Sequence, residues 1–160
     1  MKLIGTYKDE QDIKNTILDM AQKKKQVVYG QQAVNIQLPK NYQRKTKDYD
    51  IYTKQPEKSA KELAEKLNKE FGKEEFKVSK GKHEGTYKVL KGKKTIVDYT
   101  SRTRKPNTKN ILGVRYANLE YQKRKLKEIL KNKEIEYRHL KDKDTLEKIN
   151  KSEMTKFLLS

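Results

Sequence analysis

The stretch VVYGQQAVNIQLPKNYQRKTKDYDIYT, residues 27–53, carries the pattern from which the rest of the chain is interpreted. Within it, Asp48 and Asp50 stand two residues apart in an apolar-flanked run. Side chains at that spacing leave a β-strand on the same face. If the run is a strand, it therefore presents a pair of carboxylates on one face. The alternative is a turn at a strand edge that holds two solvated acids.

The same stretch contains a glycine turn. Residues 27–29 are apolar, Gly30 follows them, and residues 31–37 are typical of a short helix. Free backbone N–H groups and the helix dipole at such a turn favour an anion such as phosphate. Gly30 could also serve only as a turn glycine.

Residues 38–47, LPKNYQRKTK, lead directly into the acidic pair and contain four cations, Lys40, Arg44, Lys45 and Lys47. A basic loop beside a carboxylate cluster could hold a polyphosphate while the carboxylates hold its metal ions. A solvated loop without a ligand is the other interpretation.

A third acid follows in a predicted antiparallel meander. Short strands separated by glycine-containing turns are expected over residues 76–79, 86–90 and 95–99. The last strand carries Asp98, which strict alternation places on the same face as Ile96. If that strand lies beside the strand with the acidic pair, three carboxylates converge. A capped acid at the sheet edge is the alternative for Asp98.

Apolar periodicity predicts helices on both sides of these strands. Residues 9–25 and 56–71 repeat apolar side chains at helical spacing. Beyond a basic linker over residues 101–110, we expect a long amphipathic helix from about Leu112 and a last helix over about 143–159.

These elements indicate one α+β domain, since 160 residues suit one core. We predict a mixed or antiparallel sheet with helices packed on one face and a helical C-terminal extension. The predicted α/β core comprises residues 1–104, and residues 105–160 form the helical extension packed on it. Residues 1–8 could add an edge strand.

The composition is strongly basic, because 40 Lys and Arg against 22 Asp and Glu give a formal charge of +18. The positive potential of so small a body attracts polyanions, so nucleic acid and nucleotide phosphates are the expected partner class. Lysines that serve only solubility are the alternative, because they are dispersed among glutamates.

The chain has no cysteine, which excludes a disulfide framework and a thiolate metal site. No apolar run approaches the roughly 20 residues that span a bilayer. The first residues lack the apolar segment of a signal peptide. We therefore expect a cytoplasmic protein without a membrane partner. His83 and His139 each lack a second His or Cys nearby and are not expected to bind a metal.

The order of strand, glycine turn, short helix, basic loop, Asp-x-Asp strand, helix and later strand with one Asp resembles a known catalytic core. It is that of the DNA polymerase beta-like nucleotidyltransferase superfamily, in which a Gly-Ser or Gly-Gly turn precedes an acidic pair and a third acid lies on a later strand. Here these positions fall on Gly30-Gln31, on Asp48 and Asp50, and on Asp98. The segments YGQQAVN and RKTKDYDIY are also similar to small standalone members.

The resemblance implies transfer of a nucleotidyl group from a nucleoside triphosphate to a hydroxyl of nucleic acid or protein, with Mg²⁺ or Mn²⁺ as cofactor. The implied catalytic and metal-binding residues are Asp48, Asp50 and Asp98. The implied nucleotide-binding residues are Gly30, Gln31, Arg44, Lys45 and Lys47. The sequence departs from the superfamily pattern at Gln31, where Ser or Gly is preferred, and in the long interval between Gly30 and Asp48.

Two further hypotheses remain open beside this one. The same scaffold without turnover would be a basic nucleic-acid-binding module, because a fold does not determine a function. A component of a toxin–antitoxin pair would differ in its biology and would behave alike in a transfer assay.

Overall fold

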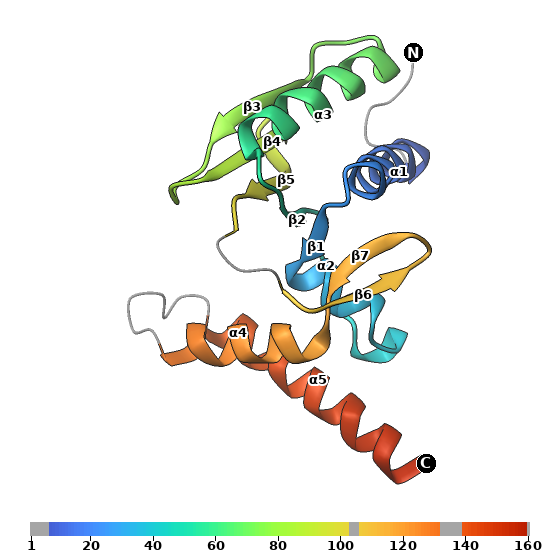
Figure 1. The fold of residues 1–160 in the computed structure, drawn as a ribbon. Coiled ribbons are helices and arrows are strands. Elements are labelled where there is room, and N and C mark those ends of the chain that lie inside the picture. The colour runs from blue at the N-terminus through green and yellow to red at the C-terminus, as the bar shows by residue number, and fades with distance from the viewer. Residues whose placement is uncertain (1–6, 103–105, 132–138, 160) are drawn as a thin grey trace.

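The computed structural model describes residues 7–102, 106–131 and 139–159 (Figure 1). In chain order the elements are α1 (Tyr7–Lys23), β1 (Val27–Tyr29), α2 (Gly30–Ile36), the 3-10 turn η1 (Lys40–Tyr42), β2 (Tyr49–Tyr52), α3 (Pro56–Phe71), β3 (Phe76–Lys80), β4 (Thr86–Lys91), β5 (Lys94–Thr100), β6 (Thr108–Ile111), β7 (Val114–Ala117), α4 (Leu119–Lys131) and α5 (His139–Leu159).

One mixed sheet contains all seven of these strands, in the order β3-β4-β5-β2-β1-β7-β6. The central strand β2 is antiparallel to β1 and parallel to β5. Strands β3, β4 and β5 form the antiparallel meander predicted from the sequence. On the other side, β7 pairs in parallel with β1, and β6 completes a hairpin with β7.

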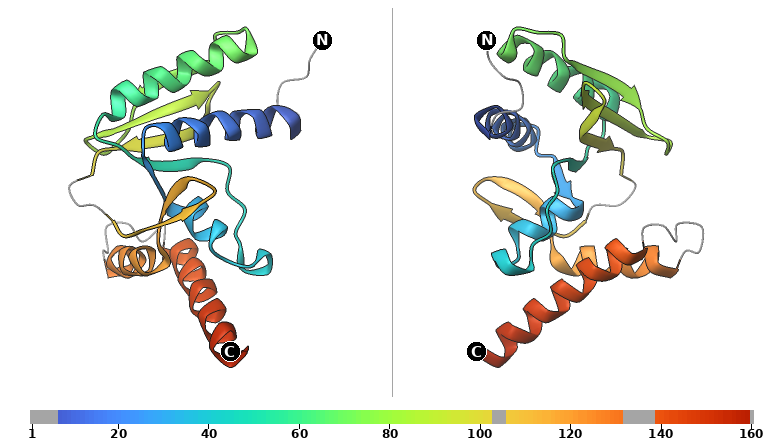
Figure 2. Two further views of the ribbon diagram at one scale, coloured as in Figure 1. Left: turned by 45° about the vertical axis from the view of Figure 1, so that its right-hand side comes forward. Right: turned by 180° about the vertical axis from the view of Figure 1, so that it is seen from behind.

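Helices α1 and α3 lie on one face of the sheet, as the views in Figures 1 and 2 agree. Their apolar stripes and the inward side chains of the strands form the main core. Its most deeply buried members include Ile17, Met20, Val28, Ile51, Leu63, Leu67, Val89, Val97 and Tyr99. The α+β class with a mixed sheet is therefore confirmed.

Helix α3 shows how the sequence sets its own limits. Pro56 occupies the first turn, where its missing N–H has no intrahelical partner to lose. Gly72 ends the helix with φ 66°, a left-handed conformation in which glycine avoids the strain of a Cβ atom. Between these ends, the apolar stripe of α3 is buried against the sheet.

The long helix predicted from about Leu112 is wrong in its first part, because residues 108–117 form the hairpin β6–β7. Leu112 is 95% exposed at the hairpin turn, while Val114 and Tyr116 alternate into the core. Leu112 and Tyr116, four positions apart, fit a helix, but Val114 and Tyr116, two positions apart, fit a strand equally well. Pairing with β1 selects the strand. The helix starts only at Leu119; the division at residue 104 stays a prediction.

Strand β5 contains an irregularity that affects the predicted faces. The register with β4 shifts between Val89 and Leu90, so Ile96 is passed over between the pairs of its neighbours. Ile96 packs in the same core cluster as Val97 and Tyr99, and the prediction that it shares a face with Asp98 is wrong. Such a bulge breaks strict alternation along a strand.

The structure leaves the predicted edge strand at the N-terminus largely undescribed. The edge strand considered for residues 1–8 lies outside the described residues up to position 6, and α1 has begun by Tyr7. Among the described helices, none combines the length and apolar character that crossing a bilayer requires. The cytoplasmic location stays a prediction.

Replacing Leu63 by Ala tests the packing of α3 on the sheet. Leu63 is fully buried, so we expect the free energy of unfolding to fall by about 2 to 5 kcal/mol. The exposed Lys66 on the same helix is the control, and Lys66→Ala should change stability by no more than about 0.5 kcal/mol. Urea unfolding measures both, and equal losses would contradict this packing.

Candidate active site

Three carboxylates meet on the sheet face opposite α1 and α3. Strands β2 and β5 are parallel neighbours, and their register places Asp50 beside Asp98. Asp48 lies immediately before β2. One carboxylate oxygen from each of the three residues lies within 4.8 Å of the others, and all three residues are half-buried.

Alternation along the two strands determines where these acids point. Tyr49 and Ile51 of β2 are buried in the main core, which directs Asp50 to the other face. In β5, Val97 and Tyr99 do the same for Asp98. The apolar residues between and around the acids thus create the carboxylate cluster, because each core residue fixes its neighbour on the opposite face.

Gly30 is required at its position for two independent reasons. Its φ of +73° is a left-handed conformation that disfavours side chains. In addition, a Cβ atom on Gly30 would fall well inside van der Waals contact of Asp50 Oδ2. The absence of a side chain therefore lets the Asp50 carboxylate sit directly against the turn between β1 and α2.

Neighbouring side chains hold two of the acids in place. The Thr46 hydroxyl donates to Asp48 Oδ1 at 3.1 Å. Lys88 Nζ donates to Asp98 Oδ1 at 2.9 Å, and this pair is only partly exposed, with 32% of the Lys88 side chain and 18% of the Asp98 side chain accessible. These contacts restrict the carboxylate rotamers and so preorganise the cluster.

The donor set suits a hard divalent cation. Mg²⁺ and Mn²⁺ prefer oxygen ligands, and Mg²⁺ is commonly held by one or two carboxylates together with substrate phosphates. Three carboxylates this close repel one another, and Lys88 offsets only part of their charge. The residues present therefore fit a metal ion of this class.

Two of the predicted nucleotide ligands contact α5. The Thr145 hydroxyl donates to Gln31 Oε1 at 2.9 Å, and Gln31 Nε2 donates to Asn35 Oδ1 at 2.9 Å. Arg44 donates to the backbone carbonyl of Lys141 and lies 3.4 Å from Asp144 Oδ2 through its Nε atom. The side chains of Gln31 and Arg44 therefore join the turn and the loop to this helix.

The remaining loop cations, Lys45 and Lys47, are exposed beside Asp48. The loop that carries them is anchored to α2, because Asn35 donates to the Arg44 carbonyl at 2.6 Å and accepts from its N–H at 3.1 Å. The two lysines thus immediately precede the first acid on a loop that contacts with α2 and α5 hold in place.

Sequence reasoning missed an aromatic and cationic cluster beside the acids. The Tyr29 and Tyr52 rings stack at 3.7 Å between centroids, with an angle of 8°. Lys125 of α4 places its Nζ 4.0 Å from the Tyr29 ring centroid and 2.7 Å from the Tyr52 hydroxyl. Tyr52 shares a face with Asp50, as their two-residue spacing signalled, and Tyr29 of β1 is the register partner of Asp50. Nothing in the local sequence indicated Lys125.

Burial, and after it the neighbouring Asp50 carboxylate, raise the pKa of the Tyr29 hydroxyl well above its usual value. Burial also raises the pKa of Tyr52, as does its hydrogen bond with Tyr121. Both hydroxyls therefore stay protonated at neutral pH. They can donate hydrogen bonds in the site but cannot act as general bases there.

Helix α4 also fixes the glycine turn. Gln122 is 3% exposed, and its Nε2 donates to the Gly30 carbonyl at 2.8 Å. Beside it, a hollow of about 610 Å³ opens between the sheet and α4 and is lined by residues that include Tyr52, Thr100, Arg124 and Lys125. Two of these residues, Tyr52 and Thr100, lie two positions beyond Asp50 and Asp98 on their strands, so a cationic and aromatic cavity lies near the acids.

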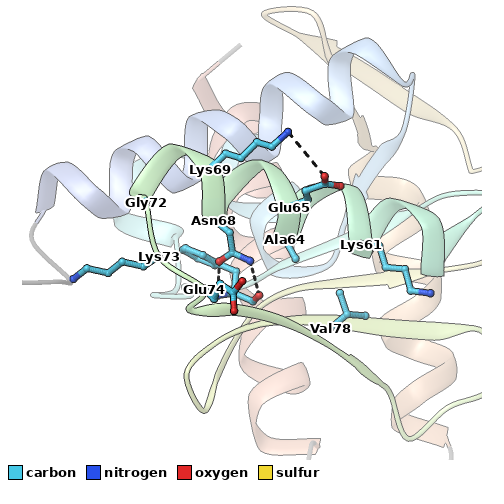
Figure 3. Close-up of a pocket in the computed structure, with 10 residues that line it drawn as sticks. Lys61, Ala64, Glu65, Asn68, Lys69, Gly72, Lys73, Glu74 and Val78 are labelled. Carbon is cyan, nitrogen blue, oxygen red and sulfur yellow. Dashed lines mark hydrogen bonds and ion pairs between the residues drawn. The ribbon is translucent and has the colours of Figure 1, made fainter.

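A second hollow, of about 590 Å³, lies between α3 and β3 (Figure 3). Phe76 and Val78, which line it, point to the helical face of the sheet, away from the carboxylates. Its Asn68 is engaged structurally, because its amide donates to the Phe76 carbonyl at 3.0 Å and accepts from the Phe76 N–H at 2.9 Å. This hollow is separate from the acidic cluster.

Comparisons with known proteins identify a matching family and similar folds. The sequence model of the family described as poly(A) polymerase catalytic subunit matches residues 15–138. The fold is similar to the crystal structure of the Megavirus polyadenylate synthase, with TM-score 0.78 and 21% identity, over 94% of this chain and 32% of that chain. It is also similar to JHP933 from Helicobacter pylori, with TM-score 0.50 and 12% identity, over 78% of this chain and 58% of that chain.

The structural matches show a shared fold. Together with the family match, they confirm the nucleotidyltransferase fold that the sequence resemblance predicted. The chain spans about a third of the length of the Megavirus protein that it matches. No curated protein sequence matches it.

Replacing Gly30 by Ala tests the contact between the turn and Asp50. We expect the left-handed backbone to cost about 1 to 2 kcal/mol of stability. The added methyl group should also displace the Asp50 carboxylate and weaken Mn²⁺ binding by about tenfold or more. Calorimetric titration with Mn²⁺ and urea unfolding measure the two effects.

Gly72→Ala is the matched control, because Gly72 has a similar φ of +66° and nothing within 4 Å of the added Cβ. It should lose comparable stability and keep the Mn²⁺ affinity of the parent protein. Equal Mn²⁺ affinity in both variants would refute the role of this contact.

Proposed function

Because the chain belongs to the family of poly(A) polymerase catalytic subunits, we propose that it is a metal-dependent nucleotidyltransferase. Its substrates would be a nucleoside triphosphate and a hydroxyl of a nucleic acid. The observation that carries this proposal is the meeting of Asp48, Asp50 and Asp98 within 4.8 Å, against a glycine turn.

In this proposal Asp48, Asp50 and Asp98 hold Mg²⁺ or Mn²⁺. When bound, the metal ions neutralise phosphate charge and make the attacking hydroxyl more acidic. Asp98 faces the acceptor and accepts the hydrogen bond of its hydroxyl, while Lys88 keeps the Asp98 carboxylate oriented. Phosphoryl transfer needs little covalent help from a protein, so positioning and charge are the main contributions of these residues.

The triphosphate is assigned to the turn and the loop. Backbone N–H groups at Gly30 and Gln31, at the start of α2, are proposed to contact phosphate oxygens. Lys45 and Lys47 are the loop cations proposed as charge clamps. Arg44 and the Gln31 side chain are proposed to act indirectly, since their contacts with α5 hold the loop and the turn.

A second candidate function rests on Gln31. The superfamily prefers a small residue at this position, and here the side chain is engaged by Thr145 and Asn35. A turn altered in this way favours a protein that binds nucleic acid through its net charge of +18 without turnover. The two functions differ in whether the acids matter, since binding through Lys and Arg does not require them.

Changing the acids tests catalysis. Asp48→Asn and Asp50→Asn remove ligand charge while keeping side-chain size. Loss of a residue that only supports a metal ligand typically lowers activity by roughly 10- to 100-fold. Because Asp48 and Asp50 are proposed as ligands themselves, we expect a larger fall in the transfer of labelled nucleotide to DNA, RNA or protein acceptors. Asp19→Asn, on the exposed surface of α1, is the control and should leave transfer unchanged. Transfer at parental rates by both site variants would overturn the proposal.

Metal binding can be tested without turnover. An ion that binds only the folded state stabilises it by about 2.7 kcal/mol at a concentration of 100 times its Kd. We therefore expect Mn²⁺ to raise the Tm of the parent protein, EDTA to reverse the shift and abolish transfer, and Asp50→Asn to lack the shift. An equal Mn²⁺-dependent shift in Asp50→Asn and the parent would place the ion elsewhere.

A further inference from the structure

One part of the sheet beside the acids has no covering helix. The views in Figures 1 and 2 place α1 and α3 on one side of β3, β4 and β5, and no helix of the described residues lies over the other side. The side chains that alternation directs to this other side of β3 and β4 are Lys77, Ser79, Lys88 and Leu90, here called the open face.

The register connects the open face directly to the site. Ser79 of β3 pairs with Lys88 of β4, Lys88 pairs with Asp98 of β5, and Asp98 pairs with Asp50 of β2. Residues paired in this way project from the same side of a sheet. The bond from Lys88 Nζ to Asp98 Oδ1 confirms this for the pair nearest the acids. One continuous row of polar side chains therefore runs from the edge strand to the carboxylates.

The charge of this region is complementary to a phosphodiester backbone. Between Lys73 and Lys94 the chain has eight lysines and three glutamates, and alternation along β3 and β4 directs two of these lysines, Lys77 and Lys88, to the open face. Lys77 and Ser79 are exposed, and an ammonium group has three N–H donors, so the bond of Lys88 to Asp98 leaves donors for a phosphate. Two interstrand spacings separate Ser79 from Asp98, about 10 Å, so a strand held here reaches the carboxylates.

The two ends of the row differ in what they can hold. Asp50 lies against the glycine turn, which the proposed function assigns to the triphosphate. Asp98 lies between Asp50 and Lys88, on the side away from that turn. An approach to Asp98 over β4 and β3 therefore avoids the position assigned to the triphosphate.

We propose that the open face binds the acceptor as single-stranded nucleic acid, with Lys88, Ser79 and Lys77 contacting successive phosphates that precede its terminal nucleoside. The direction of the bound strand, with its terminal hydroxyl at Asp98, rests on the proposed function. Binding of nucleic acid to the open face does not require that the protein catalyse transfer. Its partner class follows from charge and hydrogen-bond donors, which recognise the backbone without regard to sequence.

Strand β3 offers a matched pair of lysines for the test. Lys77 is on the open face, whereas Lys80 pairs with Tyr87, which packs against the core, and lies near Glu57 of α3, on the helical face. Lys77→Glu and Lys80→Glu change the net charge equally. Binding of a fluorescent single-stranded RNA oligonucleotide is measured by anisotropy over a series of salt concentrations.

We expect Lys77→Glu to weaken binding by about fivefold or more and to reduce the slope of log K against log salt by about 0.7, the value for one lost phosphate contact to a single strand. Lys80→Glu should stay within about twofold of the parent. An equal loss of RNA affinity in the two variants would show that only the net charge matters, and would overturn the proposal. Parental binding by Lys77→Glu, or a parent that binds no RNA, would also overturn it.

A transfer assay separates this inference from the proposed function. The parent and Lys77→Glu proteins are given labelled nucleotide with either a dinucleotide or a long RNA acceptor. Loss of transfer only on the long acceptor supports the open face, because a dinucleotide is too short to reach β3. If the parent transfers to neither acceptor, the proposed function fails, and the anisotropy comparison still decides whether the open face binds nucleic acid.

Discussion

The parallel pairing of β2 with β5 is the constraint on which the site depends. It places Asp50 beside Asp98, although 48 positions separate them in the sequence. The pairing is maintained by the core on the opposite face, where Ile51, Val97 and Tyr99 pack against α1 and α3. A shift of one residue would turn every side chain of β2 to the other face. Burial of apolar surface on one side thus fixes the spacing of negative charge on the other.

Much of this arrangement could be predicted from local pattern. The Asp48 and Asp50 spacing, the glycine turn and the stripe of α3 each depend on residues that are close in sequence. The hairpin β6–β7 was missed because its apolar spacing fits two periods, and only its partner β1 selects the strand. The bulge at Ile96 was missed because irregular pairing depends on the neighbouring strand.

The site was predictable in its acids and not in its surroundings. The alternation that exposes Asp50 also exposes Tyr52, but the sequence does not show that Tyr29 stacks on it or that Lys125 covers the pair. Gln31 and Arg44 were predicted to bind nucleotide, and the contacts of their side chains with α5 were not foreseen. Contacts between residues that are more than 70 positions apart depend on how helices dock, which local pattern does not encode.

The bond from Gln122 to the Gly30 carbonyl has a consequence for the order in which the protein forms during synthesis. Chains emerge from the N-terminus, and long-range contacts wait for their later partner. The turn emerges early, but its support lies 92 residues downstream. A nascent chain that ends before α4 would contain all three acids but would lack the Gln122 side chain that bonds the Gly30 carbonyl. The turn beside the acids is therefore complete only after the synthesis of a helix that contributes none of the acids.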